Sequence, residues 1–500
     1  MMRAAARTKV SWACAVCLGL LGGCAVGPDF TRPPEPAIGA YTAIPSPETL
    51  AAGPGEPDQR LVVGREISAE WWELFRSPEL TATIDQALVG NQTLAAARAT
   101  LAQAQEALVQ ARAAFYPQVT ATGRAEREKT GASGVGGSSG SPVNIFSLGP
   151  TVSYSPDVFG GTRRQVEQAA ALAESQDRQL AAAYLTLTGN VASQAIGVAG
   201  TRLEIAAVEE IIADDEKNLD LVRAKLDAGK AARTDVLTAE AQLMNDRVLL
   251  PPLLQQLSVA RDALSVLLGR FPAEWTPPDF DLARLTLPGE LPVTLPSDLV
   301  HQRPDILEAE ANLHTASAAI GVATAQMYPS IVLSASAGLE AVMTSGLSEG
   351  VKEMWSLASA VSAPIFEGGA LVAQRRGAVD AYRGSLAVYR QTVLEAFGQV
   401  ADTLQALAHD AELVAAARRA LDVADASLAL QRESYEAGKS NVLLLLDSQR
   451  LDQQARLAYA RAETERYEDT SQLFVAMGGR WWLAPADCES QPRANGCTSG

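Results

Sequence analysis

Apolar side chains recur at every seventh position along two long stretches of this chain. In residues 161–226, which contain no proline, the repeating positions are Ile205, Ile212, Leu219 and Leu226. The same pattern returns 209 residues later, at Val414, Leu421, Leu428 and Tyr435. Each stretch can be interpreted as an ordinary amphipathic helix, but a strict seven-residue period kept in both favours coiled-coil packing with a left-handed supercoil. At 1.5 Å per residue, a helix over 161–226 would span about 100 Å.

Each long helix is predicted to end at a glycine, after which the chain reverses. Gly229 and Gly438 occupy equivalent places, and glycine adopts the left-handed conformation of a helix C-terminus at the lowest cost. Beyond Gly229 the seven-residue period resumes at Val236, Leu243, Leu250, Leu257 and Leu264. The Pro251-Pro252 pair has no counterpart at Ala460-Arg461, so the two returning helices are expected to differ there.

Candidate strands precede each long helix. A helix over 80–115 is predicted to stop at Tyr116-Pro117, because proline removes a backbone donor and disfavours helix in the residue before it. Four strands are expected, over 118–128, 145–155, 330–343 and 353–363. The first two flank a loop over 130–142 that is dominated by Gly and Ser. Each strand has about ten residues, the length that crosses a bilayer at a tilt.

The chain contains the same unit twice. The aligned segments are Tyr116-Pro117 with Tyr328-Pro329 (offset 212), Gly160-Gly161 with Gly368-Gly369 (offset 208), and residues 227–230 with 436–439 (offset 209). Offsets so nearly constant indicate one structural unit, helix–strand–strand–helix, used twice. A few strands can span a bilayer only as part of a closed barrel, and four strands cannot close one alone. Several copies of the chain must therefore contribute strands, provided that the strands span the membrane.

The first residues are typical of a lipoprotein signal rather than of a folded segment. Arg3, Arg7 and Lys9 form a basic region, and the apolar stretch after it has about a dozen residues, too few for a spanning helix. Small residues then precede Cys24, which predicts cleavage after residue 23 and lipidation of Cys24. An ordinary signal peptide with an accidental cysteine is the alternative. A multiply acylated cysteine would anchor the chain firmly in a membrane.

Six segments are expected along the chain. They are a signal peptide over 1–23, a lipid-anchored, Pro-rich tether over 24–70, a first repeat over 71–271, a linker over 272–298, a second repeat over 299–482 and a tail over 483–500. Cys488 and Cys497 lie in the tail and could form a local disulfide in an oxidising compartment. Two unpaired thiols are the alternative.

Charge and residue usage exclude several classes of protein. The formal net charge is −17, which argues against a nucleic-acid partner. No run of 18 apolar residues follows the signal, so no spanning helix is expected. The three histidines, His301, His314 and His409, are scattered and fit neither a metal site nor a catalytic triad. The Gly-rich stretch over 131–140 lacks the lysine of a phosphate loop. We therefore expect no enzyme, no catalytic residues, no metal and no cofactor.

These residues resemble a known family, the outer-membrane channel lipoproteins of tripartite, RND-type efflux systems. The family belongs to the TolC-like superfamily, and the chain is most similar to its NodT-like branch. Residues 24–30 with Pro33 resemble the mature N-terminus of that branch, and Arg303-Pro304-Asp305-Ile306 resembles its second-repeat signature. The opening Trp71-Trp72 with Phe75 also fits. The resemblance covers nearly the whole chain after the signal.

The resemblance implies an α+β membrane protein that works as a homotrimer. Three protomers with four strands each would form a 12-stranded β-barrel, continued by a long α-helical coiled-coil barrel built from the two internal repeats. The implied function is a passive outer-membrane exit duct that exports small molecules and extends into the periplasm. The implied partners are a periplasmic adaptor protein, an inner-membrane RND-type transporter and outer-membrane lipid.

The resemblance also implies a gate at the periplasmic tip of the helices. Carried over by position, the gate residues are Thr234, Asp235, Tyr435, Ser440, Leu444 and Asp447. A Tyr hydroxyl or a cation bonded to Asp235 would hold the tip shut, and three Asp447 carboxylates around a narrow axis would favour cations. Ser440 stands where the family has an arginine, and Leu444 where it has an aspartate, so closure is expected to be partly hydrophobic. Helix capping by Asp235 and a solvated surface position for Asp447 are the alternatives.

The two turns at the tip are expected to meet the adaptor, because small residues there let helical hairpins dock end to end. The turn residues are Gly229, Lys230, Gly438 and Lys439. Other functions stay open at this point: a channel for metal-ion efflux or protein secretion, or a structural coiled-coil lipoprotein spacer. The paired strands argue against a spacer, and the seven scattered methionines argue weakly against copper or silver as the exported ion.

Overall fold

The computed structural model describes residues 25–43, 47–53, 56–65, 67–129, 142–344 and 347–479, with the backbone alone at 342–344 and 347–349. The predicted signal peptide, Cys24, almost all of the loop expected over 130–142, and the tail with Cys488 and Cys497 therefore lie outside the described residues. The chain divides into two compact units, which we describe separately. The first contains the described parts of Met1–Pro33, Thr100–Gln176 and Ala309–Tyr389, and the second contains the rest.

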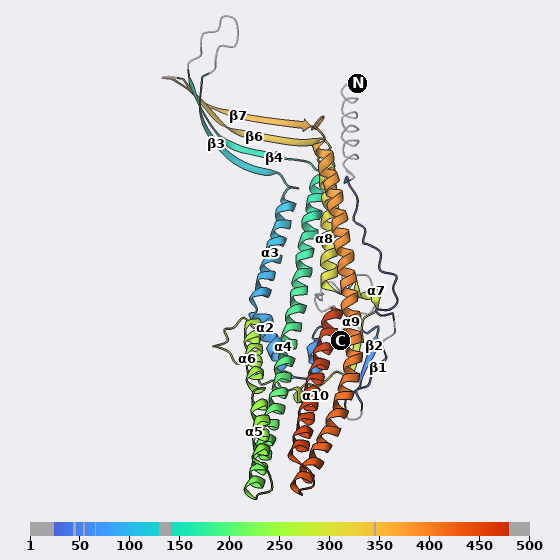
Figure 1. Cartoon of the computed structure of the whole chain (residues 1–500). Coiled ribbons are helices and arrows are strands. Elements are labelled where there is room, and N and C mark those ends of the chain that lie inside the picture. Colours follow the sequence, from blue (N-terminus) through green and yellow to red (C-terminus); the bar gives the residue numbers. More distant parts are fainter. Residues whose placement is uncertain are drawn as a thin grey trace. The chain divides into compact units, whose positions relative to one another are not determined.

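A curved, antiparallel sheet of four strands dominates the first unit (Figure 1). Its strands are β3 (Gln118–Glu128), β4 (Val143–Tyr154), β6 (Ser330–Thr344) and β7 (Leu347–Ser362). The order is β3-β4-β6-β7, so β3 and β7 are the edges, each paired on one side only. All four predicted strands are confirmed, and β3 has the bounds expected from the sequence.

The register of this sheet separates apolar from polar side chains. One cross-strand row consists of Val119, Val152, Ala335 and Leu357. The adjacent row consists of Thr120, Thr151, Ser336 and Ser356. Because successive side chains of a strand point to opposite faces, the two rows lie on opposite faces of the sheet. The apolar face is open in the single chain: Trp355 is 80% exposed and Leu357 is 78% exposed.

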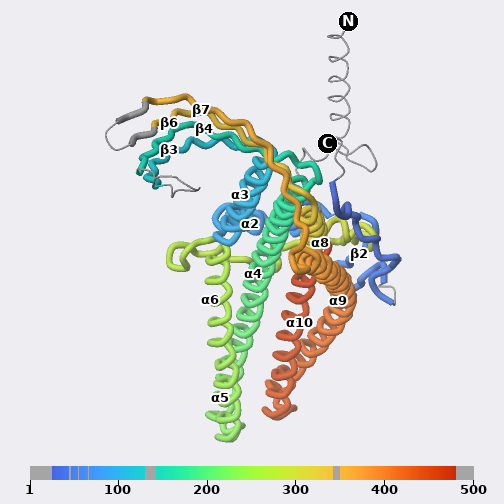
Figure 2. The backbone as a smooth tube through the Cα atoms, turned by 90° about the horizontal axis from the view of Figure 1, so that it is seen from above, coloured from blue at the N-terminus to red at the C-terminus, as the bar shows by residue number. Residues whose placement is uncertain are grey.

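Two long helices carry the seven-residue pattern. They are α4 (Gly161–Asp227) and α9 (Ala370–Glu436), and each has 67 residues. Figure 2 shows that the chain reverses after each of them. It returns beside α4 as α5 (Arg233–Arg247) and α6 (Leu250–Leu267), and beside α9 as the continuous α10 (Val442–Met477). The predicted difference at the Pro251-Pro252 pair is confirmed, since the first returning helix is interrupted just before these prolines.

The seven-residue pattern marks buried positions in the second unit. Leu219 and Val222 of α4 are buried in one apolar cluster with Leu428 and Tyr435 of α9. The same cluster includes six residues of the returning helices, namely Val236, Ala239, Leu243, Val442, Leu445 and Leu446. The pattern therefore identifies the side chains through which the two helical hairpins contact each other, as coiled-coil packing requires.

The helix predicted over 80–115 is two helices, α2 (Pro78–Gly90) and α3 (Gln92–Ala113). Asn91 separates them, because its side-chain Oδ1 accepts the backbone amide of Leu94 at 2.9 Å and so begins a new helix. Its Nδ2 donates to the carbonyl of Leu267, the last residue of α6, at 2.8 Å. An asparagine in a helical pattern can cap a helix, and this tertiary contact selects that role.

The two Pro-rich segments, expected as a tether and a linker, meet in a small second sheet. It has the order β1-β2-β5, and its strands are β1 (Thr49–Leu50), β2 (Gln59–Val63) and β5 (Glu290–Val293). β2 and β5 run parallel. Near this sheet the short helices η1 (Trp71–Phe75), η2 (Leu282–Arg284) and α7 (Pro296–Leu299) precede α8 (Pro304–Ala325). Trp71 is buried, and its ring centroid lies 5.5 Å from that of Phe474.

Candidate functional site

The turns after α4 and α9 have the same geometry. Gly229 has φ of +69° and Gly438 has φ of +72°. In each turn the glycine amide and the next lysine amide donate back to carbonyls three and five residues earlier. The bonds are Gly229 to Leu226 (2.8 Å), Lys230 to Lys225 (2.7 Å), Gly438 to Tyr435 (3.0 Å) and Lys439 to Ser434 (2.8 Å). These bonds satisfy the last carbonyls of both helices, and the positive φ explains why both positions are glycine.

Asp235, the third residue of α5, and Asn441, the residue before α10, both accept backbone amides at the starts of the returning helices. The Asp235 carboxylate Oδ2 accepts the backbone amide of Ala232 at 2.9 Å, and the Asn441 Oδ1 accepts the amide of Leu444 at 3.0 Å. Asp235 therefore has the capping role that was the alternative to a gate contact. Its neighbour Thr234 is exposed. Both side chains lie at the tip, where a partner or a neighbouring copy can reach them.

Lys225 of α4 and Tyr435 of α9 form a polar contact between the two hairpins at the tip. The Lys225 ammonium Nζ lies 3.6 Å from the centroid of the Tyr435 ring and also donates to the Tyr435 carbonyl. Burial lowers the pKa of Lys225, opposed by the carboxylate of Glu436. Burial and the nearby Asp235 carboxylate raise the pKa of Tyr435. Within the described residues, no hydrogen bond joins the Tyr435 hydroxyl to Asp235.

The remaining predicted gate residues have different surroundings. The Ser440 hydroxyl Oγ is buried and has no hydrogen-bond partner among the described residues. Leu444 is 49% exposed, whereas the adjacent Leu445 is fully buried, so the leucines of this run divide between solvent and the hairpin core. Asp447 is exposed, and its Oδ1 accepts from Arg450 at 2.8 Å on the same helix. In the single chain this carboxylate pairs with an arginine of its own helix.

Polar contacts continue between the hairpins along the helices. Arg432 of α9 contacts Asp214 of α4 at 3.3 Å, and Gln449 of α10 donates to Asp215 of α4 at 3.2 Å. Arg456 of α10 contacts Glu210 of α4 at 2.9 Å. Separation of the hairpins would break all three contacts. They therefore resist the motion that would open the tip.

A pair of buried carboxyl groups lies within this set. Asp215 of α4 and Asp246 of α5 are each 4% exposed. Gln242 and Gln453 donate to Asp246 at 2.7 and 2.6 Å, whereas Asp215 Oδ2 receives no hydrogen bond from the described residues. Burial, and then the Asp246 carboxyl beside it, raise the pKa of the Asp215 carboxyl to about 8. A proton shared by the pair would satisfy the otherwise unpartnered oxygen.

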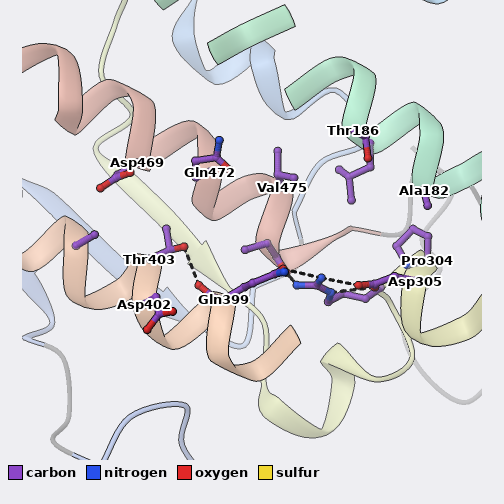
Figure 3. A pocket seen from close by; sticks show the side chains of 14 residues that line it. Ala182, Thr186, Pro304, Asp305, Gln399, Asp402, Thr403, Asp469, Gln472 and Val475 are labelled. Atoms are coloured by element: carbon purple, nitrogen blue, oxygen red, sulfur yellow. Dashed lines mark hydrogen bonds and ion pairs between the residues drawn. The ribbon is translucent and has the colours of Figure 1, made fainter. Parts of the chain in front are cut away.

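The signature around Arg303 has a structural explanation. Figure 3 shows this region, a cleft of about 530 Å³ lined by α4, α8, α9 and α10. The Arg303 guanidinium donates to Asp305 Oδ2 at 2.6 Å, to Gln399 Oε1 at 2.9 Å and to the Ala476 carbonyl at 2.9 Å. That carbonyl lies in the last turn of α10, where carbonyls lack partners within the helix. Arg303 therefore caps α10 and joins it to α8 and α9.

The segment expected to follow the lipid anchor is held in the first unit by Arg164 of α4. The Arg164 side chain is 5% exposed, and it donates to Asp29 Oδ1 at 2.7 Å and to the Val26 carbonyl at 3.2 Å. The Val26 amide donates to the Phe159 carbonyl at 3.1 Å. A Cβ at Gly27 would lie 2.5 Å from the backbone of Gly321, so this position admits only glycine. Residues 25–29 therefore form a bound arm.

The sequence pattern located the residues of the tip, but it did not predict the contact between Lys225 and Tyr435. The turn glycines, both turn lysines and all six predicted gate residues lie on the two hairpins at or near the turns, and Tyr435 is central among them. Lys225 was missed because its counterpart 209 residues later is Ser434, so the repeat gave no signal there. Asp215 and Asp246 were missed because acidic residues on an amphipathic helix ordinarily face solvent.

Two features are absent from the part of the chain that the structure describes. No group of three or more His, Cys, Asp or Glu side chains in this part of the chain could hold a metal ion. Among the helices described, none is both long enough and apolar enough to cross a membrane.

Comparison with known proteins identifies relatives over most of the chain. The family model for outer membrane efflux protein matches residues 83–270 and 295–479. The chain is 30% identical to the pyoverdine export outer membrane protein OpmQ of Pseudomonas aeruginosa, over 89% of this chain and 95% of that protein. It is 29% identical to nodulation protein T of Rhizobium leguminosarum bv. viciae, over 92% and 91%.

Solved structures agree with this assignment. The outer-membrane channel OprN superposes with a TM-score of 0.82 at 27% identity, over 92% of this chain and 100% of that one. The MtrE outer membrane channel of Neisseria gonorrhoeae, solved in its open state, gives 0.78 at 26% identity, over 92% and 99%. The fold combines long helices with a four-stranded sheet, and its relatives match nearly the full chain. The chain belongs to the outer membrane efflux protein family.

Proposed function

We propose that three copies of this chain form the passive outer-membrane exit duct of a tripartite efflux pump. Each copy supplies four strands to a 12-stranded barrel and its long helices to a coiled-coil tube that continues the barrel. These strands and helices are divided between the two internal repeats of the chain. The observation that carries the proposal is the register of the sheet. One face is apolar, as lipid contact requires, the other is polar, as a water-filled lumen requires, and both edges lack a partner.

The gate lies at the tip formed by the turns after α4 and α9. In the closed state Lys225 and Tyr435 hold the two hairpins together, and Asp447 lines the constriction. Thr234, Ser440 and Leu444 complete the narrow region, with Asp235 acting as a helix cap and as a charge near Tyr435. Opening requires the Lys225–Tyr435 contact and the three polar contacts above it to break together.

The chain is anchored by a lipidated Cys24, and its mature part begins with the tether. Arg164 supports this assignment, because it fixes residues 25–29 at the helix that follows β4. The domain plan is that expected from the sequence, from the signal peptide over 1–23 to the tail over 483–500. The turn residues around Gly229 and Gly438 dock onto a periplasmic adaptor, which connects the duct to an inner-membrane RND-type transporter. Small organic molecules, rather than metal ions, are the cargo.

Single-channel conductance in planar bilayers tests this function. Purified protein is expected to give a small, cation-selective conductance that rises when Lys225 is replaced by methionine. Lys217→Met is the matched control, because Lys217 is 72% exposed and pairs with Asp214 of its own helix. Folded protein that is trimeric but gives no conductance in either form would support a structural spacer instead. An unchanged conductance in Lys225→Met would be compatible with a duct but would contradict the proposed role of Lys225 in closing the gate.

A further inference from the structure

A small cavity lies between α4 of the first helical hairpin and α10 of the second. Its volume is about 10 Å³, which is room for one water-sized particle. The polar part of its lining consists of Glu210, Asp214 and Asp215 of α4 and of Gln449, Asp452 and Arg456 of α10. The cavity is therefore part of the contact between the two hairpins.

Three buried oxygen atoms of this lining receive no hydrogen bond from the described residues. They are Oδ2 of Asp215, Oε1 of Gln449 and Oδ1 of Asp452. These three residues are 4%, 7% and 4% exposed, so bulk solvent does not reach the oxygens. A buried oxygen without a partner costs free energy, and one bound particle that contacts all three oxygens would recover that cost.

The other polar atoms of the same residues hold these oxygens in place. Gln449 Nε2 donates to Asp215 Oδ1 at 3.2 Å, and Arg456 Nε donates to Asp452 Oδ2 at 2.6 Å. An amide oxygen and the oxygens of ionised carboxyl groups can only accept hydrogen bonds. A water molecule has two hydrogens and cannot donate to three acceptors. The set of oxygens therefore fits a cation better than a water molecule.

The charges around the cavity also favour a cation. Four carboxyl groups line it, and one arginine, Arg456, faces them. This arginine is already shared among Asp452, Glu210 and Asp425, at 2.6, 2.9 and 3.3 Å. No cationic side chain of the described residues pairs with Asp215. Negative charge is thus left uncompensated in a buried place, where a further cation would neutralise part of it.

The type of ligand and the available space select the ion. Carboxylate and amide oxygens are typical ligands of Ca²⁺ and Mg²⁺. Mg²⁺ usually keeps several waters, for which a cavity of this size has no room, whereas Ca²⁺ accepts irregular sets of oxygen ligands. Because one ligand is an amide, the site is not a cluster of three or more His, Cys, Asp or Glu side chains, none of which could hold a metal ion in the described part of the chain.

We propose that this cavity binds one Ca²⁺ ion through Asp215, Gln449 and Asp452, and that the bound ion holds the two hairpins together. Asp215 belongs to α4 and the other two ligands belong to α10, so separation of the hairpins would pull the ligands apart. Without the ion, Asp215 keeps the proton that it shares with Asp246, because ion and proton compete for the same carboxyl group. The binding site requires no assumption about transport, whereas its effect on the gate rests on the proposed function.

Titration calorimetry of the full chain, purified in detergent and treated with a chelator, tests the binding. The unmodified protein is expected to bind one Ca²⁺ per chain, and to bind Mg²⁺ more weakly. Asp215→Asn is expected to lower the Ca²⁺ affinity about tenfold or more. Asp220→Asn, at a side chain 79% exposed on the same helix, is the matched control and should leave the affinity unchanged. Equal binding in Asp215→Asn, or no binding by folded unmodified protein, would overturn the site.

A second pair of variants keeps the charge of the site. Gln449→Met removes the amide ligand. Gln453→Met is the matched control, because Gln453 is 8% exposed on the same helix and donates to the buried Asp246. Each variant loses one hydrogen bond to a buried carboxyl group, but only Gln449 lines the cavity. Ca²⁺ is expected to bind to Gln453→Met as it binds to the unmodified protein, and to bind more weakly to Gln449→Met.

Hydrogen exchange followed by mass spectrometry tests whether the ion holds the hairpins together. Ca²⁺ is expected to slow exchange around Asp215 and Asp452 in the unmodified protein and in Gln453→Met, but not in Gln449→Met. Equal slowing in both variants, or tight binding without slowing, would contradict the proposed role of the ion. These measurements do not require conduction, so their failure would leave the proposed duct untouched.

Discussion

The Lys225 ammonium lies against the face of the Tyr435 ring, 3.6 Å from its centroid, and donates to the carbonyl of the same residue. Neither contact uses the tyrosine hydroxyl. The family resemblance implied that a Tyr hydroxyl or a cation would bond Asp235. In the single chain the Asp235 carboxylate accepts the Ala232 amide at the start of its own helix. A partly buried cation over an aromatic ring contributes about 0.5–2 kcal/mol.

Replacement of Tyr435 therefore distinguishes the ring from the hydroxyl. Tyr435→Phe keeps the ring and the carbonyl and is expected to leave the closed-state conductance close to that of the unmodified protein. Tyr435→Leu removes the ring and is expected to raise the open probability. Conductance in planar bilayers measures both. A large increase in Tyr435→Phe would show that the hydroxyl holds the tip shut.

The buried Asp215–Asp246 pair predicts a dependence of stability on pH. The folded protein holds the Asp215 proton up to about pH 8, whereas an unfolded aspartic acid loses it near pH 4. Between these values the folded state binds more protons, so the free energy of unfolding falls as the pH rises. The thermal midpoint is expected to decline from pH 5 to pH 8 in the unmodified protein. Asp215→Asn should make this decline less steep, while other buried carboxyls with raised pKa values, such as Asp410, keep part of it.

The control for this prediction is an exposed aspartate of the same helix. Asp220→Asn, at a side chain 79% exposed, is expected to keep the pH dependence of the unmodified protein. A decline that is equally steep in Asp215→Asn would mean that other groups carry the pH dependence.

Arg303 is expected to stabilise the fold through geometry that lysine cannot reproduce. Its guanidinium contacts Asp305, Gln399 and the Ala476 carbonyl at once, whereas an ammonium cannot form the bidentate contact with Asp305. Arg303→Ala is expected to cost about 1–3 kcal/mol, and Arg303→Lys should restore only part of the loss. Thermal unfolding in detergent measures both. Arg450→Ala, which breaks an exposed ion pair, should have little effect.

Arg164 is expected to hold the N-terminal arm. In Arg164→Gln the Asp29 contact and the bond to the Val26 carbonyl are lost, so the Val26 amide should exchange its hydrogen faster. Hydrogen exchange followed by mass spectrometry over residues 25–33 measures this change. Arg383→Gln, which removes an exposed pair within α9, should leave the arm protected. Equal protection in both variants would assign the arm's attachment to the backbone bond alone.

Strands and long helices could be predicted because their signals are local or repeated. The bounds of β3 follow from Tyr116-Pro117 on one side and a Gly-rich stretch on the other, and the seven-residue period identifies the buried face of α4. The small sheet could not be predicted in this way. β2 and β5 are separated by more than 200 residues, and the two-residue β1 is too short to show alternation.

Side-chain partners at the tip were predicted less well than the tip itself. Position along the repeat located Tyr435. Its partner depends on how α4 and α9 are rotated against each other, and the sequence of one helix does not determine that rotation. The same limit applies to Asp215, because its counterpart 209 residues later is Ala424, which has no carboxyl group. Contacts between helices that differ in the two halves therefore require the packed structure.

α4 and α9 have the same length, 67 residues each, so the two turns that follow them lie at matching distances along their helices. An insertion in only one of them would displace its turn past the other by about 1.5 Å per residue, and Lys225 would no longer reach Tyr435. Insertions and deletions in these helices must consequently arise as matched pairs. Across evolution, helix length is expected to vary less than the identity of almost any residue on the helix surface.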